Sequence, residues 1–164
     1  MISADDVSVR DIEREDHTRW AELYRAYLEL YRLIPDEAII QRVWGWVLEP
    51  AHEIRGLVAT LNGRVVGLAH YRRFSRPSSG TVGVFLDDLF DDAEVRTRDV
   101  GRALLTELSR LSAQDDNSVV RWITAADNTA ARRLYDSTAA ATDWVTYDLD
   151  PGSLAPQQTP APTI

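Results

Sequence analysis

The sequence of 164 residues contains no cysteine and no lysine, and these absences exclude several kinds of site. Without cysteine there are no disulfides, no cysteine nucleophile and no thiolate–metal site. All 18 basic residues are arginines, and 26 acidic residues outnumber them, so the net charge is −8. This charge argues against a nucleic-acid-binding protein, which would carry a basic face. It is compatible with a cationic amine as substrate.

Long apolar runs are also missing, at the N-terminus and elsewhere. The sequence therefore predicts neither a signal peptide nor a transmembrane span, and we expect a cytoplasmic protein without a membrane partner. The histidines and carboxylates show no spacing typical of metalloenzymes, so we expect no metal site.

The length and composition, with 45% hydrophobic and 27% charged residues, are typical of one soluble globular domain. We place this domain in residues 1–150. Residues 151–164 contain four prolines and almost nothing to bury. We therefore expect them to form a disordered tail.

Hydrophobic periodicity predicts a mixture of strands and helices. Asn62-Gly63 between two apolar runs predicts a hairpin with a type I′ turn. Residues 74–80 are expected to form a polar loop, and the alternation at 144–149 predicts a final strand that closes the sheet. In chain order the expected elements are a strand at 7–10, helices at 20–31 and 37–48, strands at 56–61, 64–71 and 81–90, a helix at 96–111, a strand at 119–124, a helix at 128–136 and the strand at 144–149.

The stretch from Phe85 to Leu111 organises the rest of the chain. It is predicted to be a strand that ends in carboxylates, a tight turn, and a helix that opens with Arg96, Arg98 and Gly101. Backbone N–H groups and guanidinium groups gathered at a helix N-terminus favour a phosphorylated ligand. The sequence therefore predicts a site for such a ligand where this helix begins.

Two motifs resemble those of the GNAT superfamily of N-acetyltransferases. The run from Arg96 to Gly101 is similar to the family's helix-opening pattern Arg/Gln-x-x-Gly-x-Gly/Ala, with Asp99 in place of the central Gly. The run from Asn128 to Tyr135 is similar to the second pattern, Asn-x-x-Ala-x-x-Leu/Phe-Tyr. Residues 86–90, LDDLF, resemble the acidic strand end of the diamine (polyamine-type) branch. The resemblance covers most of residues 7–149 and implies an α/β (α+β) fold, with a mixed, mostly antiparallel sheet flanked by helices.

The resemblance also implies acetyl transfer from acetyl-CoA to an amine, and it assigns roles to residues. Tyr135 matches the tyrosine that donates a proton to the leaving thiolate. Asp87 matches the glutamate that acts as general base through water. Asp88 competes for that role, because strand alternation turns two adjacent carboxylates to opposite faces. The residues at cofactor-binding positions are Leu89 and Phe90 for the pantetheine arm, Arg96, Thr97, Arg98, Asp99, Val100, Gly101 and Arg102 for the pyrophosphate, and Asn128 on the cofactor side.

Each of these residues also has a structural interpretation. Asp87 and Asp88 could be solvated carboxylates at a strand end, Tyr135 could be a core tyrosine, and Asn128 could cap its helix. The first two predicted helices are expected to wall the acceptor site. The candidate lining groups are Trp44, Trp46, Asp36 or Glu37, and His70 at the end of its strand. A small amine or a polyamine is favoured, a protein amine is an alternative acceptor, and a homodimer is compatible with the family's habit.

Asp99 separates two interpretations of the chain. A carboxylate about 5 Å from a phosphate charge costs roughly 3 kcal/mol at an effective dielectric of 20, enough to cripple cofactor binding. If Asp99 turns away and caps the helix, the chain is a working enzyme. If it faces the pyrophosphate, the chain is a catalytically impaired acyl-CoA-binding or regulatory module with the same fold. The arginines nearby favour the first interpretation narrowly.

Overall fold

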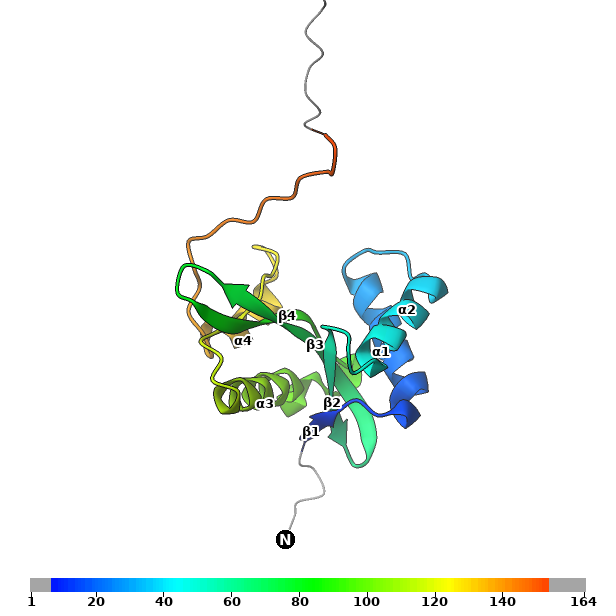
Figure 1. Cartoon of the computed structure of the whole chain (residues 1–164). Helices are drawn as coiled ribbons and strands as arrows, with labels where there is room; N and C mark the ends of the chain where they lie inside the picture. The colour runs from blue at the N-terminus through cyan, green and yellow to red at the C-terminus, as the bar shows by residue number, and fades with distance from the viewer. Residues whose placement is uncertain (1–6, 154–164) are drawn as a thin grey trace, which may run out of the picture.

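The computed structural model of the chain describes residues 7–153, except for the side chains of residues 96–98. Its centre is one five-stranded sheet in the order β1-β2-β3-β4-β5 (Figure 1). Neighbouring strands are antiparallel except β4 and β5, which are parallel. The strands are β1 (Ser8–Asp11), β2 (Arg55–Leu61), β3 (Arg64–Arg76), β4 (Thr81–Asp91) and β5 (Val120–Arg121). The predicted mixed, mostly antiparallel sheet flanked by helices is therefore confirmed.

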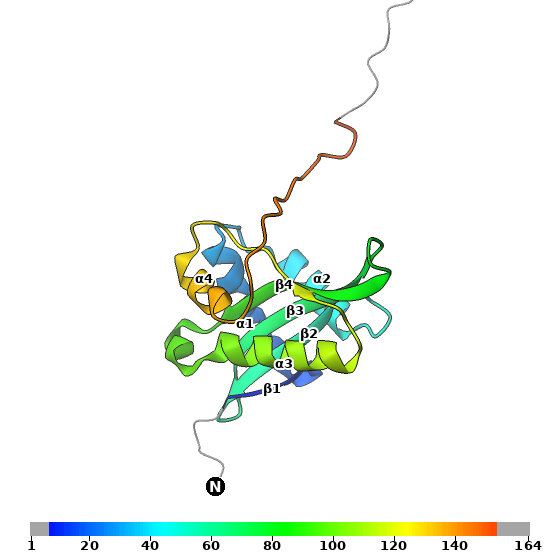
Figure 2. The ribbon, with the colours of Figure 1, turned by 90° about the vertical axis from the view of Figure 1, so that its left-hand side faces the viewer.

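Helices cover both faces of this sheet (Figure 2). One face carries α1 (His17–Leu30) and α2 (Glu37–Leu48), and the other carries α3 (Val100–Gln114) and α4 (Thr129–Asp136). Two short 3-10 helices, η1 (Arg14–Asp16) and η2 (Ala93–Arg98), lead into α1 and α3. None of the helices in the described part of the chain is long and apolar enough to cross a membrane.

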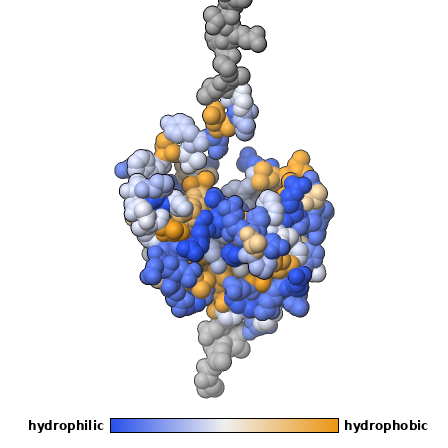
Figure 3. All heavy atoms as spheres, in the orientation of Figure 1, coloured by the Kyte–Doolittle hydropathy of each residue, from blue (hydrophilic) through white to orange (hydrophobic). Residues whose placement is uncertain are grey.

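Alternation along the central strands separates two hydrophobic cores. Val58 and Leu68 point to the α1–α2 side, whereas Leu57 and Ala69 point to the α3 side. Period-2 alternation produces this division because each strand is covered on both faces. On the exposed surface, polar residues dominate the face shown in Figure 3, and apolar residues form separate patches.

The hairpin between β2 and β3 confirms the predicted turn. Asn62 and Gly63 have φ angles of 52° and 77°, the two positive values that a type I′ turn needs. β3 is longer than predicted, because Phe74, Ser75 and Arg76 still pair with β4. The predicted loop at residues 74–80 is therefore reduced to residues 77–80.

The predicted final strand at residues 144–149 is wrong. These residues form no strand and extend away from the body (Figure 1). Trp144 and Tyr147 are 85% and 87% exposed. The neighbouring edge explains this result, since β5 pairs over only two residues and offers almost no ladder to extend. In the predicted tail, residues 151–153 form a turn, and residues 154–164 lie outside the described part.

Candidate active site

A β-bulge in β4 gathers the two candidate carboxylates on one face. His70 pairs with Asp88 and Tyr71 pairs with Leu86, which leaves Asp87 as an extra residue in β4. An extra residue interrupts alternation, so neighbours on either side of it can share a face. Leu86 and Leu89, on either side of the pair, both pack on the α3 side, so Asp87 and Asp88 turn toward the α1 side, where both charges act on Tyr24. The expectation that alternation separates the two carboxylates is therefore wrong.

The side chain of Asp88 is held by a buried histidine. His70 Nδ1 lies 2.8 Å from Asp88 Oδ2, and the indole N–H of Trp20 donates to His70 Nε2 at 3.0 Å. The side chain of His70 is 1% exposed and that of Asp88 is 18% exposed. The edge of Tyr24 packs against the imidazole. Asp88 is thus a partly exposed carboxylate that is anchored through Oδ2.

Asp87 lies in a different environment. Arg72 Nε donates to its carboxylate at 3.1 Å, and both side chains are about one-third exposed. Burial raises the pKa of Asp87, Arg72 lowers it, and the charge of Asp88 raises it again. The net direction is upward, so Asp87 accepts a proton more readily than a free aspartate does.

A row of phenols connects this face to the second motif. Burial raises the pKa of Tyr27, and the charge of Asp88 and a hydrogen bond to it raise it further. The rings of Tyr27 and Tyr31 lie 4.9 Å apart. Burial raises the pKa of Tyr135 to about 12, with smaller effects from Tyr31 and Asp91. Tyr135 also meets the ring of Trp122 edge-on at 5.2 Å. It therefore stays protonated at neutral pH.

The strands β4 and β5 separate beside these residues. Their pairing ends at Phe85 and Arg121, so within the described part of the chain β5 does not extend alongside residues 86–90. The backbone of this segment is free to pair with an extended ligand. The side chain of Leu89 packs toward α3, whereas that of Phe90 is buried against α1 and Tyr27. An open strand edge of this kind fits the amide groups of a pantetheine arm.

The N-terminus of α3 lies at the end of the same strand. Asp99 precedes it in the left-handed region, with φ 56° and ψ 31°, and its side chain makes no capping hydrogen bond. The favoured interpretation, a capping Asp99, is therefore wrong. The carboxylate is 80% exposed, and Arg102 Nε lies 3.9 Å from it. The first N–H groups of α3 remain available for an anion.

The other residues predicted to bind the cofactor lie in different environments. Val100 is fully buried, and Gly101 faces Leu134 of α4. Asn128 caps α4, accepting from the backbone N–H of Ala131 at 3.3 Å, as its structural interpretation predicted. The backbone of Arg96, Thr97 and Arg98 belongs to η2, but their side chains lie outside the described part.

The predicted acceptor residues do not gather in one place. Trp44 packs on Trp20, with ring centroids 4.8 Å apart, in the core beside His70. Asp36 caps α2 through the N–H of Ala38, and Glu37 pairs with Arg25 of α1. Trp46 stacks on His52, away from this cluster. Only Trp44 and His70 thus lie in the aromatic cluster around Trp20.

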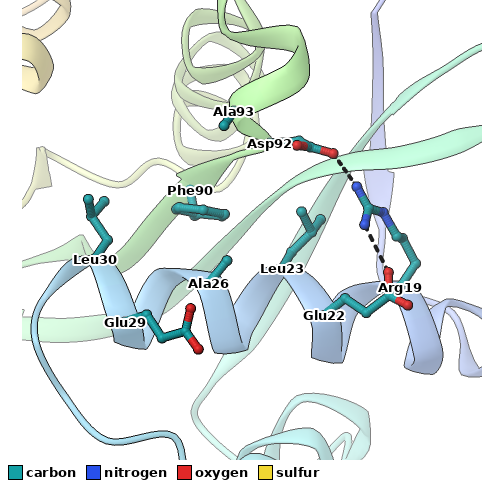
Figure 4. A pocket seen from close by; sticks show the side chains of 9 residues that line it. All are labelled: Arg19, Glu22, Leu23, Ala26, Glu29, Leu30, Phe90, Asp92 and Ala93. Carbon is teal, nitrogen blue, oxygen red and sulfur yellow. Dashed lines mark hydrogen bonds and ion pairs between the residues drawn. The ribbon is translucent and has the colours of Figure 1, made fainter.

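Figure 4 shows a hollow of about 420 Å³ between α1 and the end of β4. Its apolar wall comes from Leu23, Ala26 and Phe90, and Arg19 at one end pairs with Asp92 and Glu22. At 100° per residue these positions lie on a different flank of α1 from the tyrosines.

Sequence reasoning missed Trp20, Tyr24, Tyr27 and Arg72 as site residues. The three aromatic residues have helical spacing, which is typical of a core stripe. Their relation to Asp88 depends on the docking of α1 against β4, which the spacing does not reveal. Within residues 7–153 no group of three or more His, Asp or Glu side chains is arranged to hold a metal ion.

Comparisons with known proteins identify the family of the chain. The model of a family described as the acetyltransferase (GNAT) family matches residues 11–139. A D-amino-acid N-acetyltransferase, HPA3 of Saccharomyces cerevisiae, is 26% identical over 145 residues, which cover 87% of this chain and 90% of the relative.

Two solved structures show the same fold. A ribosomal-protein-alanine N-acetyltransferase from Brucella melitensis biovar Abortus 2308 has a TM-score of 0.75 and 20% identity, covering 88% of this chain and 99% of that one. An aminoglycoside N-acetyltransferase, AAC(6')-Iy in complex with CoA, has a TM-score of 0.75 and 15% identity, covering 92% and 99%.

Proposed function

Because the chain belongs to the acetyltransferase (GNAT) family and is an acetyl-CoA-dependent N-acetyltransferase, we propose that its acceptor is a small molecule with a cationic amine. The observation that carries this proposal is the bulge that turns Asp87 and Asp88 to one face of the sheet. Two adjacent carboxylates beside aromatic rings favour an ammonium group, through charge and through the faces of the rings.

In this proposal the two carboxylates have different roles. Asp88, held by His70, binds the ammonium. Asp87 is the general base, directly or through water, because its raised pKa favours uptake of the proton that the amine must lose before it attacks. Arg72 keeps Asp87 in place between turnovers.

In this proposal the residues that bind acetyl-CoA are those that the motifs indicate. The unpaired edge of β4, at Leu89 and Phe90, holds the pantetheine arm. Backbone N–H groups from Val100 onward, with the arginines of residues 96–102, hold the pyrophosphate. Tyr135, protonated at neutral pH, supplies the proton for the departing thiolate.

Two classes of acceptor fit the face of the sheet that carries Asp87 and Asp88. A diamine or polyamine, as in the branch that LDDLF resembles, would place one ammonium at Asp88 and use the acidic surface for another. An amino acid is the second candidate, because Arg72 lies beside Asp87 and could take the acceptor's carboxylate. The relative named as a D-amino-acid N-acetyltransferase supports that candidate.

A panel of matched acceptors tests the proposal. It contains a diamine, a polyamine, D- and L-amino acids, the corresponding amino-acid amides, and a peptide with a free N-terminus. We expect the highest kcat/KM with the diamine or polyamine, and higher values for amides than for free acids. Turnover of free amino acids alone, lost in Arg72→Gln, would establish the second candidate. Turnover of the peptide alone would contradict both.

The role of Asp87 has its own test. Asp87→Asn should lower kcat/KM by about 10²–10⁴-fold, the usual effect of losing an acid–base group, without changing acetyl-CoA affinity. In the unmodified enzyme, activity should fall as the pH drops through the raised pKa of Asp87, above the ordinary aspartate value. Full activity of Asp87→Asn would assign the base to another group.

A further inference from the structure

We infer that Trp20 and His70 are positioning residues that fix Asp88 as a hydrogen-bonded carboxylate aimed at the acceptor amine. This inference rests on the proposed function, since it concerns the carboxylate that binds the ammonium. Its physical basis is a buried chain of two hydrogen bonds, from Trp20 through His70 to Asp88.

The direction of the first hydrogen bond is fixed by chemistry. An indole N–H only donates, so the Nε2 atom of His70, 3.0 Å away, must accept. A histidine whose Nε2 accepts carries its proton on Nδ1. That proton points at Asp88 Oδ2, 2.8 Å away. Trp20 therefore selects the tautomer of His70, and the tautomer makes His70 a donor to Asp88.

Burial makes this arrangement obligatory. Trp20 is 0% exposed and His70 is 1% exposed, so water cannot replace either partner. A second proton on Nε2 would face the indole N–H and leave two donors opposed. The other ionisable groups that face His70 are Tyr24 of α1, packed edge-on against its ring, and Asp87 of β4, which acts on it electrostatically.

The consequence for Asp88 is a defined role. With one oxygen bound by His70, and with a hydrogen bond from Tyr27 as well, the group is held as an acceptor-only carboxylate. Such a group accepts hydrogen bonds from an ammonium. The proton then goes to Asp87, the less enclosed carboxylate.

NMR of protein labelled with 15N-histidine tests the tautomer directly. We expect His70 to show a protonated Nδ1 and an unprotonated Nε2, whether or not the protein turns over any amine. An Nε2–H tautomer, or a doubly protonated ring, would overturn the inference. The correct tautomer in a protein that acetylates none of the panel would support the inference about His70 and contradict only the proposed acceptor.

Two variants separate positioning from packing. His70→Asn retains an N–H near the Nδ1 position, whereas His70→Gln retains an acceptor near Nε2 but loses the donor to Asp88. We expect His70→Gln to raise the amine KM about 10- to 100-fold, as for a lost hydrogen bond to a charged group, with acetyl-CoA affinity unchanged. His70→Asn should stay within about threefold of the parent. Equal losses in both folded variants would overturn the inference.

Trp20→Phe provides the measurement if either histidine variant fails to fold. It retains an aromatic ring in the core and removes the N–H that selects the tautomer, although the smaller ring also leaves some of the buried volume unfilled. We expect the two 15N signals of His70 to move toward averaged positions and the amine KM to rise. An unchanged tautomer with an unchanged KM would show that Trp20 does not set the state of His70.

Discussion

At the scale of single residues, Asp99 shows how the backbone explains a departure from the family pattern. Its φ of 56° lies in the left-handed region. Glycine adopts this region without a steric penalty, and aspartate is among the few other residues that tolerate it. The family's glycine at this position therefore has a conformational reason, and Asp99 meets it without capping the helix. What it adds is one negative charge beside the predicted pyrophosphate site.

That charge should weaken acetyl-CoA binding modestly. The side chain is 80% exposed and lies near Arg102, so solvent and the guanidinium screen most of the roughly 3 kcal/mol expected without screening. Asp99→Asn keeps the left-handed tolerance and removes the charge. We expect calorimetric affinity for acetyl-CoA to rise about two- to fivefold at low salt and to converge with the parent at high salt. Equal affinity at both salt concentrations would place the pyrophosphate elsewhere.

Tyr135 is the second residue whose environment defines an experiment. With a pKa raised to about 12 by burial, its hydroxyl keeps its proton at neutral pH. Tyr135→Phe should lower kcat by about 10²–10⁴-fold while leaving the fold and the acetyl-CoA affinity unchanged. Tyr147→Phe, which removes a hydroxyl from an 87% exposed side chain, is the matched control. If both variants turn over equally with chemistry rate-limiting, Tyr135 is a packing residue.

At the scale of elements, the bulge in β4 marks the limit of prediction from sequence. Asp87 and Asp88 were predicted as the candidate carboxylates, but alternation predicted opposite faces. No residue in LDDLF signals a bulge, since there is no glycine or proline to mark the irregularity. The extra residue becomes visible only in the register of β3 against β4. Motifs thus predict where the candidate site lies, whereas strand pairing determines its geometry.

Glycine at two positions has opposite consequences for stability. A Cβ on Gly67 of β3 would lie 2.6 Å from Val100 Cγ1 and 3.1 Å from the backbone oxygen of Phe90. Gly67→Ala should therefore push α3 from the sheet, at a cost of about 1–3 kcal/mol in unfolding free energy. A Cβ on Gly45, inside α2, meets nothing within 4 Å, so Gly45→Ala should stabilise by about 0.5–1 kcal/mol.

Denaturant unfolding measures the change in unfolding free energy of both variants. Because α3 begins beside Gly67, Gly67→Ala should also weaken acetyl-CoA binding, and Gly45→Ala should not. A neutral Gly67→Ala would mean that α3 can shift on the sheet without loss.

At the scale of the whole molecule, most elements follow from the sequence because each is encoded locally. The aromatic stripe predicted α1, Asn62-Gly63 predicted the hairpin, and the proline after Glu49 predicted the end of α2. Helical spacing and turn chemistry depend on neighbours a few residues apart. Closure of the sheet depends on distant partners, and that is where the prediction fails, at residues 144–149.

Residues 144–149 allow a test between the closing strand that the sequence pattern predicted and the exposed segment that the structure shows. In a closing strand, residues two apart share a face, so Val145, Tyr147 and Leu149 would form one apolar face against the core. In the structure Tyr147 and Leu149 are 87% and 67% exposed, so they contribute little buried area. Tyr147→Ala combined with Leu149→Ala should therefore change the unfolding free energy by less than about 0.5 kcal/mol.

Leu104→Ala is the control for that measurement, because Leu104 is fully buried in the core between α3 and the sheet. Its loss should cost about 2–5 kcal/mol in the same denaturant titration. If the double variant approaches the cost of Leu104→Ala, residues 144–149 are packed in solution as the sequence pattern predicted, and the sheet has a further strand. If the double variant leaves the unfolding free energy unchanged while Leu104→Ala lowers it, the stabilising core is confined to the elements from β1 to α4.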